Sequence, residues 1–92
     1  MDKPLAVQVV NMTPTEAVLD WIAPQAIVEN YVIVLTHNEV VADTVLADGA
    51  TTRFQLRNLH PLTNYSVTVY AVRGSMTSAS VFINFLTRMY SP

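Results

Sequence analysis

The sequence predicts an all-β fold, an antiparallel sandwich built from seven short strands. Apolar residues recur at every second position in most segments of the 92-residue chain, the pattern of strands with one buried face. Prolines, an Asp-Gly pair and small polar residues separate these segments, as turns require. No segment shows the periodicity of an amphipathic helix. Several short strands can share one core by forming two packed sheets.

Each expected strand is bounded by turn or loop residues. The expected strands are residues 5–10, 17–22, 31–36, 40–46, 53–57, 65–72 and 81–86. Pro14 stiffens the turn before the second strand, and Pro24 follows its end. Residues 37–39 predict a tight connection into the less regular fourth strand, and Asp48-Gly49 is a strong turn signal before the fifth. Residues 73–80 predict a loop of small residues before the last strand.

The stretch from Leu59 to Val72 carries the most specific signal. Its first half contains Pro61 and small polar residues, which indicate a corner between strands. Its second half begins at Tyr65 and alternates apolar and polar residues. A tyrosine at this place can bury its ring and turn its hydroxyl back onto the backbone of the corner. The stretch therefore resembles the tyrosine corner of immunoglobulin-like sandwiches.

Nearly the whole chain resembles a fibronectin type III module. The resemblance rests on Pro4, Val7, Val9, Trp21, Tyr31, Leu59, Pro61, Tyr65 and the run 83–87. It implies an immunoglobulin-like sandwich with strands 5–10, 17–22 and 53–57 in one sheet, conventionally lettered A-B-E, and the other four in a sheet lettered C′-C-F-G. In that family Trp21 and Tyr31 would be core residues, Leu59 would close the core beneath the corner, and Tyr65 would fasten it.

Within that family the chain looks most like the modules of matrix and adhesion proteins such as fibronectin and tenascin. It lacks the cysteines and the Trp-Ser-x-Trp-Ser motif of the cytokine-receptor branch. Its length fits one domain over residues 1–92, with a core from about residue 4 to residue 88. We expect this domain to be one unit of a longer chain.

Composition excludes several classes of partner. The net charge of −2 is too small for a nucleic-acid surface. No apolar run approaches the ~18 residues of a membrane span, and no signal peptide is recognisable at the start. The absence of cysteine removes disulfides, cysteine-based zinc sites and thiol nucleophiles. We expect neither a cofactor nor a metal, and no direct membrane insertion.

No group of residues supports an enzymatic function. His37 and Glu39 share one turn but supply too few metal ligands, and His60 lies in another loop. No nucleophile stands with a base in the sequence pattern, so we expect a non-catalytic protein. Arg73-Gly74-Ser75 lies where some family members carry Arg-Gly-Asp, but a serine cannot supply the carboxylate that ligates a metal ion. We interpret this tripeptide as a turn.

An apolar face is the main candidate for function. In the family arrangement, strands 31–36, 65–72 and 81–86 are neighbours, and their outward side chains would form one patch. These side chains are Val32, Val34, Tyr70, Val72, Phe82 and Leu86, with Arg73 and Met76 in the adjoining loop. By contrast, the outward residues near strands 17–22 and 53–57 are Asp20, Arg53, Gln55 and Arg57. Contiguous apolar patches of this kind usually mark a contact with a partner.

The sequence thus predicts an extracellular adhesion or protein-interaction module, secreted or part of an ectodomain. Its expected partners are proteins: an adjacent module, a second copy, or a matrix or receptor protein. Two glycosylation sequons, beginning at Asn11 and Asn64, are consistent with this location. The alternatives are a passive spacer in a multidomain chain and an accessory sandwich of an intracellular protein. Carbohydrate binding is disfavoured because the one tryptophan is committed to the core.

Overall fold

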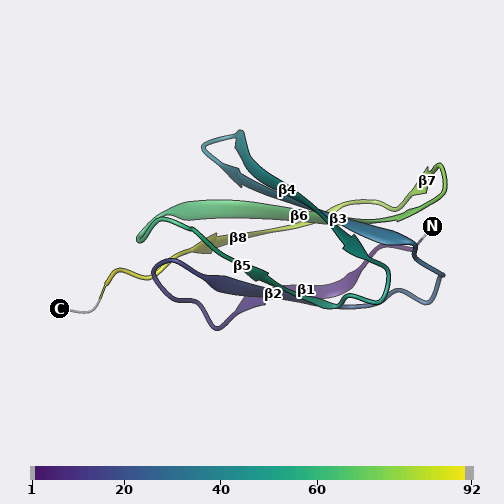
Figure 1. The fold of residues 1–92 in the computed structure, drawn as a ribbon, viewed down its shortest axis with the longest axis horizontal. Coiled ribbons are helices and arrows are strands. Elements are labelled where there is room, and N and C mark those ends of the chain that lie inside the picture. Colours follow the sequence, from purple (N-terminus) through teal and green to yellow (C-terminus); the bar gives the residue numbers. More distant parts are fainter. Residues whose placement is uncertain (1, 91–92) are drawn as a thin grey trace.

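The computed structural model describes residues 2–90 and confirms the two-sheet antiparallel sandwich. Its strands are β1 (Leu5–Val10), β2 (Ala17–Ile22), β3 (Asn30–His37), β4 (Val40–Asp48), β5 (Arg53–Leu56), β6 (Asn64–Arg73), β7 (Met76–Thr77) and β8 (Val81–Leu86). One sheet has the order β1-β2-β5, and the other has the order β4-β3-β6-β7 with β8 also paired to β6. The two layers face each other in Figure 1, and the chain enters and leaves at opposite ends of the long axis.

The seven expected strands are all present, and β7 is the one addition. It lies within the predicted loop 73–80 and pairs with the end of β6 through Val72↔Thr77 and Arg73↔Met76. A two-residue strand has no room to show alternation, so the sequence could not reveal it.

β6 lies in the middle of its sheet, and its side chains alternate between the core and the outer face. Tyr65, Val67, Val69 and Ala71 are buried, and the residues between them are half-buried. The inward side chains of the other strands complete the core. The buried core consists of Ala17, Leu19, Trp21, Tyr31, Ile33, Leu35, Ala47, Leu56, Leu59, Tyr65, Val67, Val69, Ala71 and Phe85.

Trp21 and Tyr31 form the aromatic centre of this core. Their ring centroids are 5.1 Å apart at an interplanar angle of 65°, an edge-on contact. Within residues 2–90, Trp21 Nε1 and the Tyr31 hydroxyl are buried without a hydrogen-bond partner. Each unpaired polar group costs about 1–3 kcal/mol. The two residues therefore stabilise the core through the packing of their rings and not through their polar atoms.

The corner before β6 is held by side-chain hydrogen bonds. The Tyr65 hydroxyl accepts a hydrogen bond from the His60 backbone N–H at 2.8 Å. Leu59 is buried beneath the corner and half-buried Pro61 lies within it. Thr87, which is 1% exposed, accepts from the Thr63 N–H at 2.9 Å and donates to the His60 carbonyl at 2.6 Å. The end of β8 therefore closes the same corner that Tyr65 fastens.

Two turns set the position of β4. Asn38 and Glu39 connect β3 to β4 with φ values of 51° and 64°, as a two-residue hairpin with primed turn geometry requires. At the other end, the Asp48 carboxylate accepts from the Ala50 N–H at 2.9 Å. Gly49 is required here because a Cβ on it would lie 1.8 Å from the Val28 carbonyl oxygen.

Candidate protein-binding face

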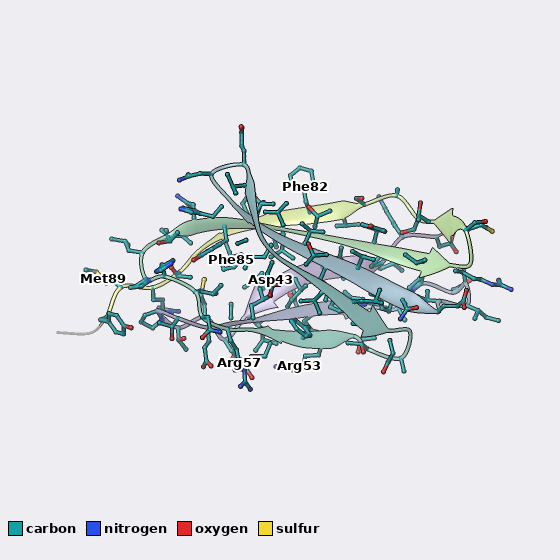
Figure 2. The ribbon with its side chains drawn as sticks, turned by 45° about the horizontal axis from the view of Figure 1, so that its top comes forward. Asp43, Arg53, Arg57, Phe82, Phe85 and Met89 are labelled. Carbon is teal, nitrogen blue, oxygen red and sulfur yellow. The ribbon has the colours of Figure 1, made fainter. Side chains whose placement is uncertain are left out.

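The outer face of the five-stranded sheet carries most of the predicted contact residues. Val32 and Val34 of β3 and Tyr70 and Val72 of β6 occupy the half-buried positions between buried core residues. Phe82 of β8 is 70% exposed. Figure 2 shows Phe82 pointing away from the molecule and Phe85, on the same strand, pointing between the sheets.

Strand pairing joins these side chains into a continuous surface. Val32 lies opposite Leu46 of β4 on one side and opposite Tyr70 of β6 on the other. One apolar row therefore crosses three adjacent strands. In the next row Val34 lies between Thr44 and Thr68, and Thr68 lies opposite Phe82. We call Val32, Val34, Leu46, Tyr70 and Phe82 the apolar strip.

Leu46 is a member of the strip that sequence reasoning missed. It is 69% exposed, although the two-residue turn alone would have directed it inward. The turn pairs His37 with Val40 and Thr36 with Val41, but Leu35 then pairs with Asp43. Ala42 is thus the extra residue of a β-bulge, which exchanges the inward and outward positions along the rest of β4.

Four predicted residues lie outside the strip. Val72 is on the same face, one row beyond Tyr70, between the polar residues Asn30 and Thr77. Leu86 lies opposite Asn64, and the polar pair Ser66 and Asn84 separates it from Phe82. The Leu86 side chain lines a surface cavity of about 510 Å³ near the end of β8, away from the strip. Arg73 and Met76 pair at the tip of the β6–β7 hairpin, and both are exposed.

The β6–β7 hairpin is hydrogen-bonded to Glu29, the residue before β3. The Gly74 N–H donates a hydrogen bond to the Glu29 carboxylate, and the Glu29 N–H donates to the Val72 carbonyl at 2.9 Å. Gly74 has φ of 58°, which a glycine adopts without strain. The arrangement fits the turn that the sequence predicted for Arg73-Gly74-Ser75.

The outer face of the three-stranded sheet is different in chemistry. Arg53, Gln55 and Arg57 project from β5, and Arg53 lies opposite Asp20 of β2. The Arg57 guanidinium donates to the Gln55 side-chain oxygen at 3.0 Å. Figure 2 shows Arg53 and Arg57 pointing outward on the side opposite to Phe82. The β5 side of this face is polar, whereas Leu5 of β1 and Ile22 of β2 lie opposite each other on it and are 47% and 59% exposed.

The two sequon asparagines lie at the same end of the sandwich but in different surroundings. Asn11 follows β1, is exposed and has φ of 50°. Asn64 is exposed and begins β6. Asn64 lines a polar depression of about 300 Å³ whose walls include Asn38, Glu39, Ser66 and Asn84.

Groups of metal ligands and membrane-spanning helices are both absent from the described part of the chain. Within residues 2–90, no three His, Cys, Asp or Glu side chains are grouped as metal ligands would be. The same residues contain no helix of the length and hydropathy needed to cross a membrane. His37 Nδ1 lies 2.9 Å from the Asn64 carbonyl oxygen, and His60 belongs to the corner.

Comparison with known proteins defines the class of module. The family model described as "Fibronectin type III domain" matches residues 2–84. The chain therefore belongs to the fibronectin type III family, whose modules in tenascin-like matrix proteins are non-enzymatic structural or binding units. Mouse tenascin-R is 48% identical over 92 residues, which are 100% of this chain and 7% of that protein. Mouse tenascin is 32% identical over 92 residues, again 100% of this chain and 4% of that protein.

Solved structures agree with this assignment at the level of the fold. A segment of two fibronectin type III domains from chicken tenascin superimposes with a TM-score of 0.89 at 24% identity, covering 95% of this chain and 50% of that one. The module is thus of the tenascin-like extracellular matrix type, and its location is extracellular. It spans less than a tenth of the length of the tenascin relatives it matches.

Proposed function

We propose that this module is a non-catalytic protein-binding unit whose contact surface is the apolar strip. The observation that supports the proposal is the unbroken row Leu46–Val32–Tyr70 across β4, β3 and β6. Isolated exposed valines are common on strands. A row that continues across three strands and adjoins an exposed phenylalanine is a surface suited to burial against another apolar surface.

The composition of the strip fits a contact of useful affinity. Burying a large apolar side chain contributes about 1.5–3 kcal/mol, and tyrosine is among the residues enriched at the energetic centre of interfaces. Tyr70 lies inside the strip, with Val32 opposite it and Phe82 one row away. The half-buried Tyr70 would act as the central anchor, and the more exposed Leu46 and Phe82 would extend the contact on either side.

A protein is the partner class that this surface fits best. Thr44 and Thr68, between the apolar members of the strip, supply hydroxyl groups for hydrogen bonds across an interface. The occupant would be a second copy, a neighbouring module, or another matrix or receptor protein. Arg73 and Met76, on the adjoining hairpin, would contribute only to the rim of such a contact. Leu86 would belong to a separate surface.

The first test is self-association measured by sedimentation equilibrium over a wide concentration range. We expect reversible association of the wild-type chain, weakened roughly tenfold or more in Tyr70→Ser with Phe82→Ser. The matched control is Ile27→Ser with Met89→Ser, which removes two side chains that are 70% and 66% exposed and lie off the strip. The control should associate as the wild type does.

Equal association of the wild type and the strip variant would contradict the proposal. If the wild-type chain is a monomer throughout, matrix and receptor proteins should be immobilised and tested for binding to the same three variants. Selective loss of binding in the strip variant would then support a foreign partner. Binding that survives the double substitution would contradict the proposal, and a module that binds none of them would be a passive spacer.

A further inference from the structure

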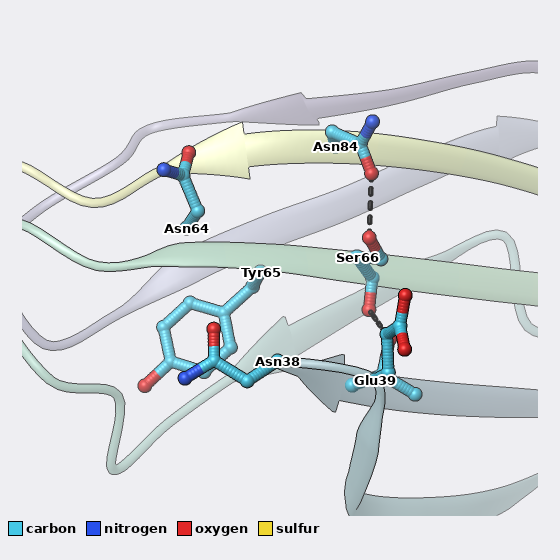
Figure 3. Close-up of a pocket in the computed structure, with 7 residues that line it drawn as sticks. Asn38, Glu39, Asn64, Tyr65, Ser66 and Asn84 are labelled. Carbon is cyan, nitrogen blue, oxygen red and sulfur yellow. Dashed lines mark hydrogen bonds between the residues drawn. The ribbon is translucent and has the colours of Figure 1, made fainter.

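The outer face of the five-stranded sheet carries a second feature at the end remote from Val72. A polar depression of about 300 Å³ is lined by Thr36, Asn38, Glu39, Asn64, Tyr65, Ser66 and Asn84. Its volume is at the lower limit of cavities that hold small ligands. Figure 3 shows Asn64, Ser66 and Asn84 along β6 and β8, and Asn38 and Glu39 on the β3–β4 turn. Amide, hydroxyl and carboxylate groups of this kind are suited to hydrogen bonding with a sugar.

Asn64 stands at the edge of this depression with its side chain free. It is the first residue of β6 and is exposed. Its backbone carbonyl is within hydrogen-bond distance of His37 Nδ1, at 2.9 Å. Within residues 2–90, its side-chain amide has no hydrogen-bond partner. The amide nitrogen is therefore available for a covalent bond without any loss of internal contacts.

The strand geometry places the acceptor tripeptide with its two reactive positions on one face. Asn64 and Ser66 are two residues apart on β6 and both face outward, whereas Tyr65 between them is buried and stacks on Phe85 with ring centroids 5.6 Å apart. The Ser66 hydroxyl donates to Asn84 Oδ1 at 2.5 Å. This pair leaves the Asn84 amide N–H groups for a further acceptor.

We propose that Asn64 is an N-glycosylation site and that its first N-acetylglucosamine lies in the polar depression against Ser66 and Asn84. In the transfer, Asn64 Nδ2 forms a bond to the anomeric carbon of a polyprenyl-pyrophosphate-linked oligosaccharide. The bond from that carbon to the pyrophosphate oxygen breaks, and the pyrophosphate leaves with the electron pair. The amide nitrogen loses one proton to a base of the transferase. An extracellular location supplies both donor and enzyme, because secreted chains pass through the compartment that holds them.

The site lies away from the Leu46–Val32–Tyr70 row of the apolar strip. Asn64 is six residues from Tyr70 along β6, which is a separation of about 20 Å at ~3.3 Å per residue. The row of Ser66 and Asn84 adjoins the row of Thr68, which contains the strip members Val34 and Phe82. A glycan here would border the Phe82 end of the strip and leave the Leu46–Val32–Tyr70 row accessible.

The other sequon lacks these features and serves as the comparison. Met12 packs against the core, and the Thr13 hydroxyl accepts from the Glu16 N–H at 2.9 Å within the β1–β2 turn. Asn11 itself has a left-handed backbone conformation, with φ of 50°. Nothing in that turn offers a linked sugar a set of polar groups like that around Asn64.

The occupancy test is secretion of the chain from a glycosylating eukaryotic host, followed by release with peptide N-glycosidase in heavy-oxygen water. We expect the peptide containing Asn64 to gain a heavy-oxygen aspartate there. Asn64→Gln and Ser66→Ala should abolish this label, whereas Ser66→Thr, which restores the acceptor hydroxyl, should retain it. Asn11→Gln should leave the label at Asn64 unchanged. Recovery of Asn64 as unmodified asparagine from secreted wild-type chain would overturn the proposal.

The position of the sugar is tested separately by NMR of the folded chain. The glycan is trimmed to its first sugar, and the side-chain amide signals are compared with those of unglycosylated chain from bacteria. We expect the signals of Asn84 and Asn38 to shift, and that of Gln55, on the opposite sheet, to stay. A sugar attached to Asn64 that leaves the Asn84 and Asn38 signals unchanged would overturn its placement in the depression.

Discussion

A single phenolic oxygen connects the corner to the core. The Tyr65 hydroxyl accepts the His60 N–H at 2.8 Å, while its ring stacks on Phe85. Tyr65→Phe keeps the ring but leaves the N–H without this partner. We expect the free energy of unfolding to fall by about 1–3 kcal/mol, measured by urea denaturation. Tyr90→Phe, at a site that is 63% exposed, should change it little, and an equal loss in both variants would contradict this role for the hydroxyl.

The two glycines have different reasons for being glycine. A Cβ at Gly49 would lie 1.8 Å from the Val28 carbonyl oxygen, whereas one at Gly74 would meet only the Glu29 carboxylate at 3.9 Å. Gly74→Ala should therefore cost only the left-handed strain, about 1–2 kcal/mol. Gly49→Ala must displace backbone and should cost more. Urea denaturation of both variants checks the order, and a smaller loss for Gly49→Ala would show that the β4–β5 turn yields easily.

Thr87 shows the limit of residue-level prediction. It follows β8 at the next inward position of the alternation, is 1% exposed and is bonded to both His60 and Thr63. Its role depends on its hydrogen bonds to Thr63 and His60 of the corner, which lie 24 and 27 residues earlier in the chain. No local pattern carries that information.

Among the elements, β7 is followed by a side chain that is hydrogen-bonded to the neighbouring strand β6. The Ser78 hydroxyl accepts from the Ala71 N–H at 2.9 Å and donates to the Ala79 carbonyl at 2.9 Å. In Ser78→Ala, the Ala71 N–H loses this acceptor at the edge of the sheet. We expect its hydrogen exchange to accelerate roughly tenfold, since a lost buried hydrogen bond costs about 1–3 kcal/mol.

The exchange of the Val67 amide, in the middle of β6, should be unaffected by that substitution. Ser80→Ala, at an exposed position near the start of β8, is the matched control and should leave Ala71 protected. Unchanged protection of Ala71 in Ser78→Ala would mean that water replaces the serine hydroxyl without cost.

The strand assignments could be predicted because most strands bury one face and expose the other. Val32, Val34, Tyr70 and Val72 were placed on the outer face by alternation alone, and the register agrees. β4 was harder, since its residues are exposed except near its end and its bulge at Ala42 has no sequence signature. That one inserted residue decides that Leu46 joins the apolar strip and Ala47 joins the core.

Contiguity of the candidate site was the less predictable part. Leu86 and Phe82 both occupy outward positions of β8, so alternation alone predicts that both belong to the apolar face. Only the register shows that Ser66 and Asn84 lie between them as a hydrogen-bonded pair. Alternation tells which face a side chain occupies, whereas its neighbours across the sheet depend on turns and bulges.

At the scale of the whole molecule, the sandwich presents two outer faces of different chemistry. One sheet carries the apolar strip, and the other carries Arg53, Gln55 and Arg57. Figure 2 shows Phe82 on one side of the molecule and Arg53 and Arg57 on the other. A partner that buries the strip would therefore leave Arg53, Gln55 and Arg57 in solvent.

The placement of the two chain ends fixes how the module carries a mechanical load. The chain enters through β1 and leaves after β8, at opposite ends of an axis of 47 Å (Figure 1). Because ladder hydrogen bonds run across the strands, a pull on the two ends would shear several of them at once instead of opening them one by one. β1 would yield first, since its register is interrupted between Leu5 and Gln8. Stretching would then release a short length of chain at β1 before the β6 corner is disturbed.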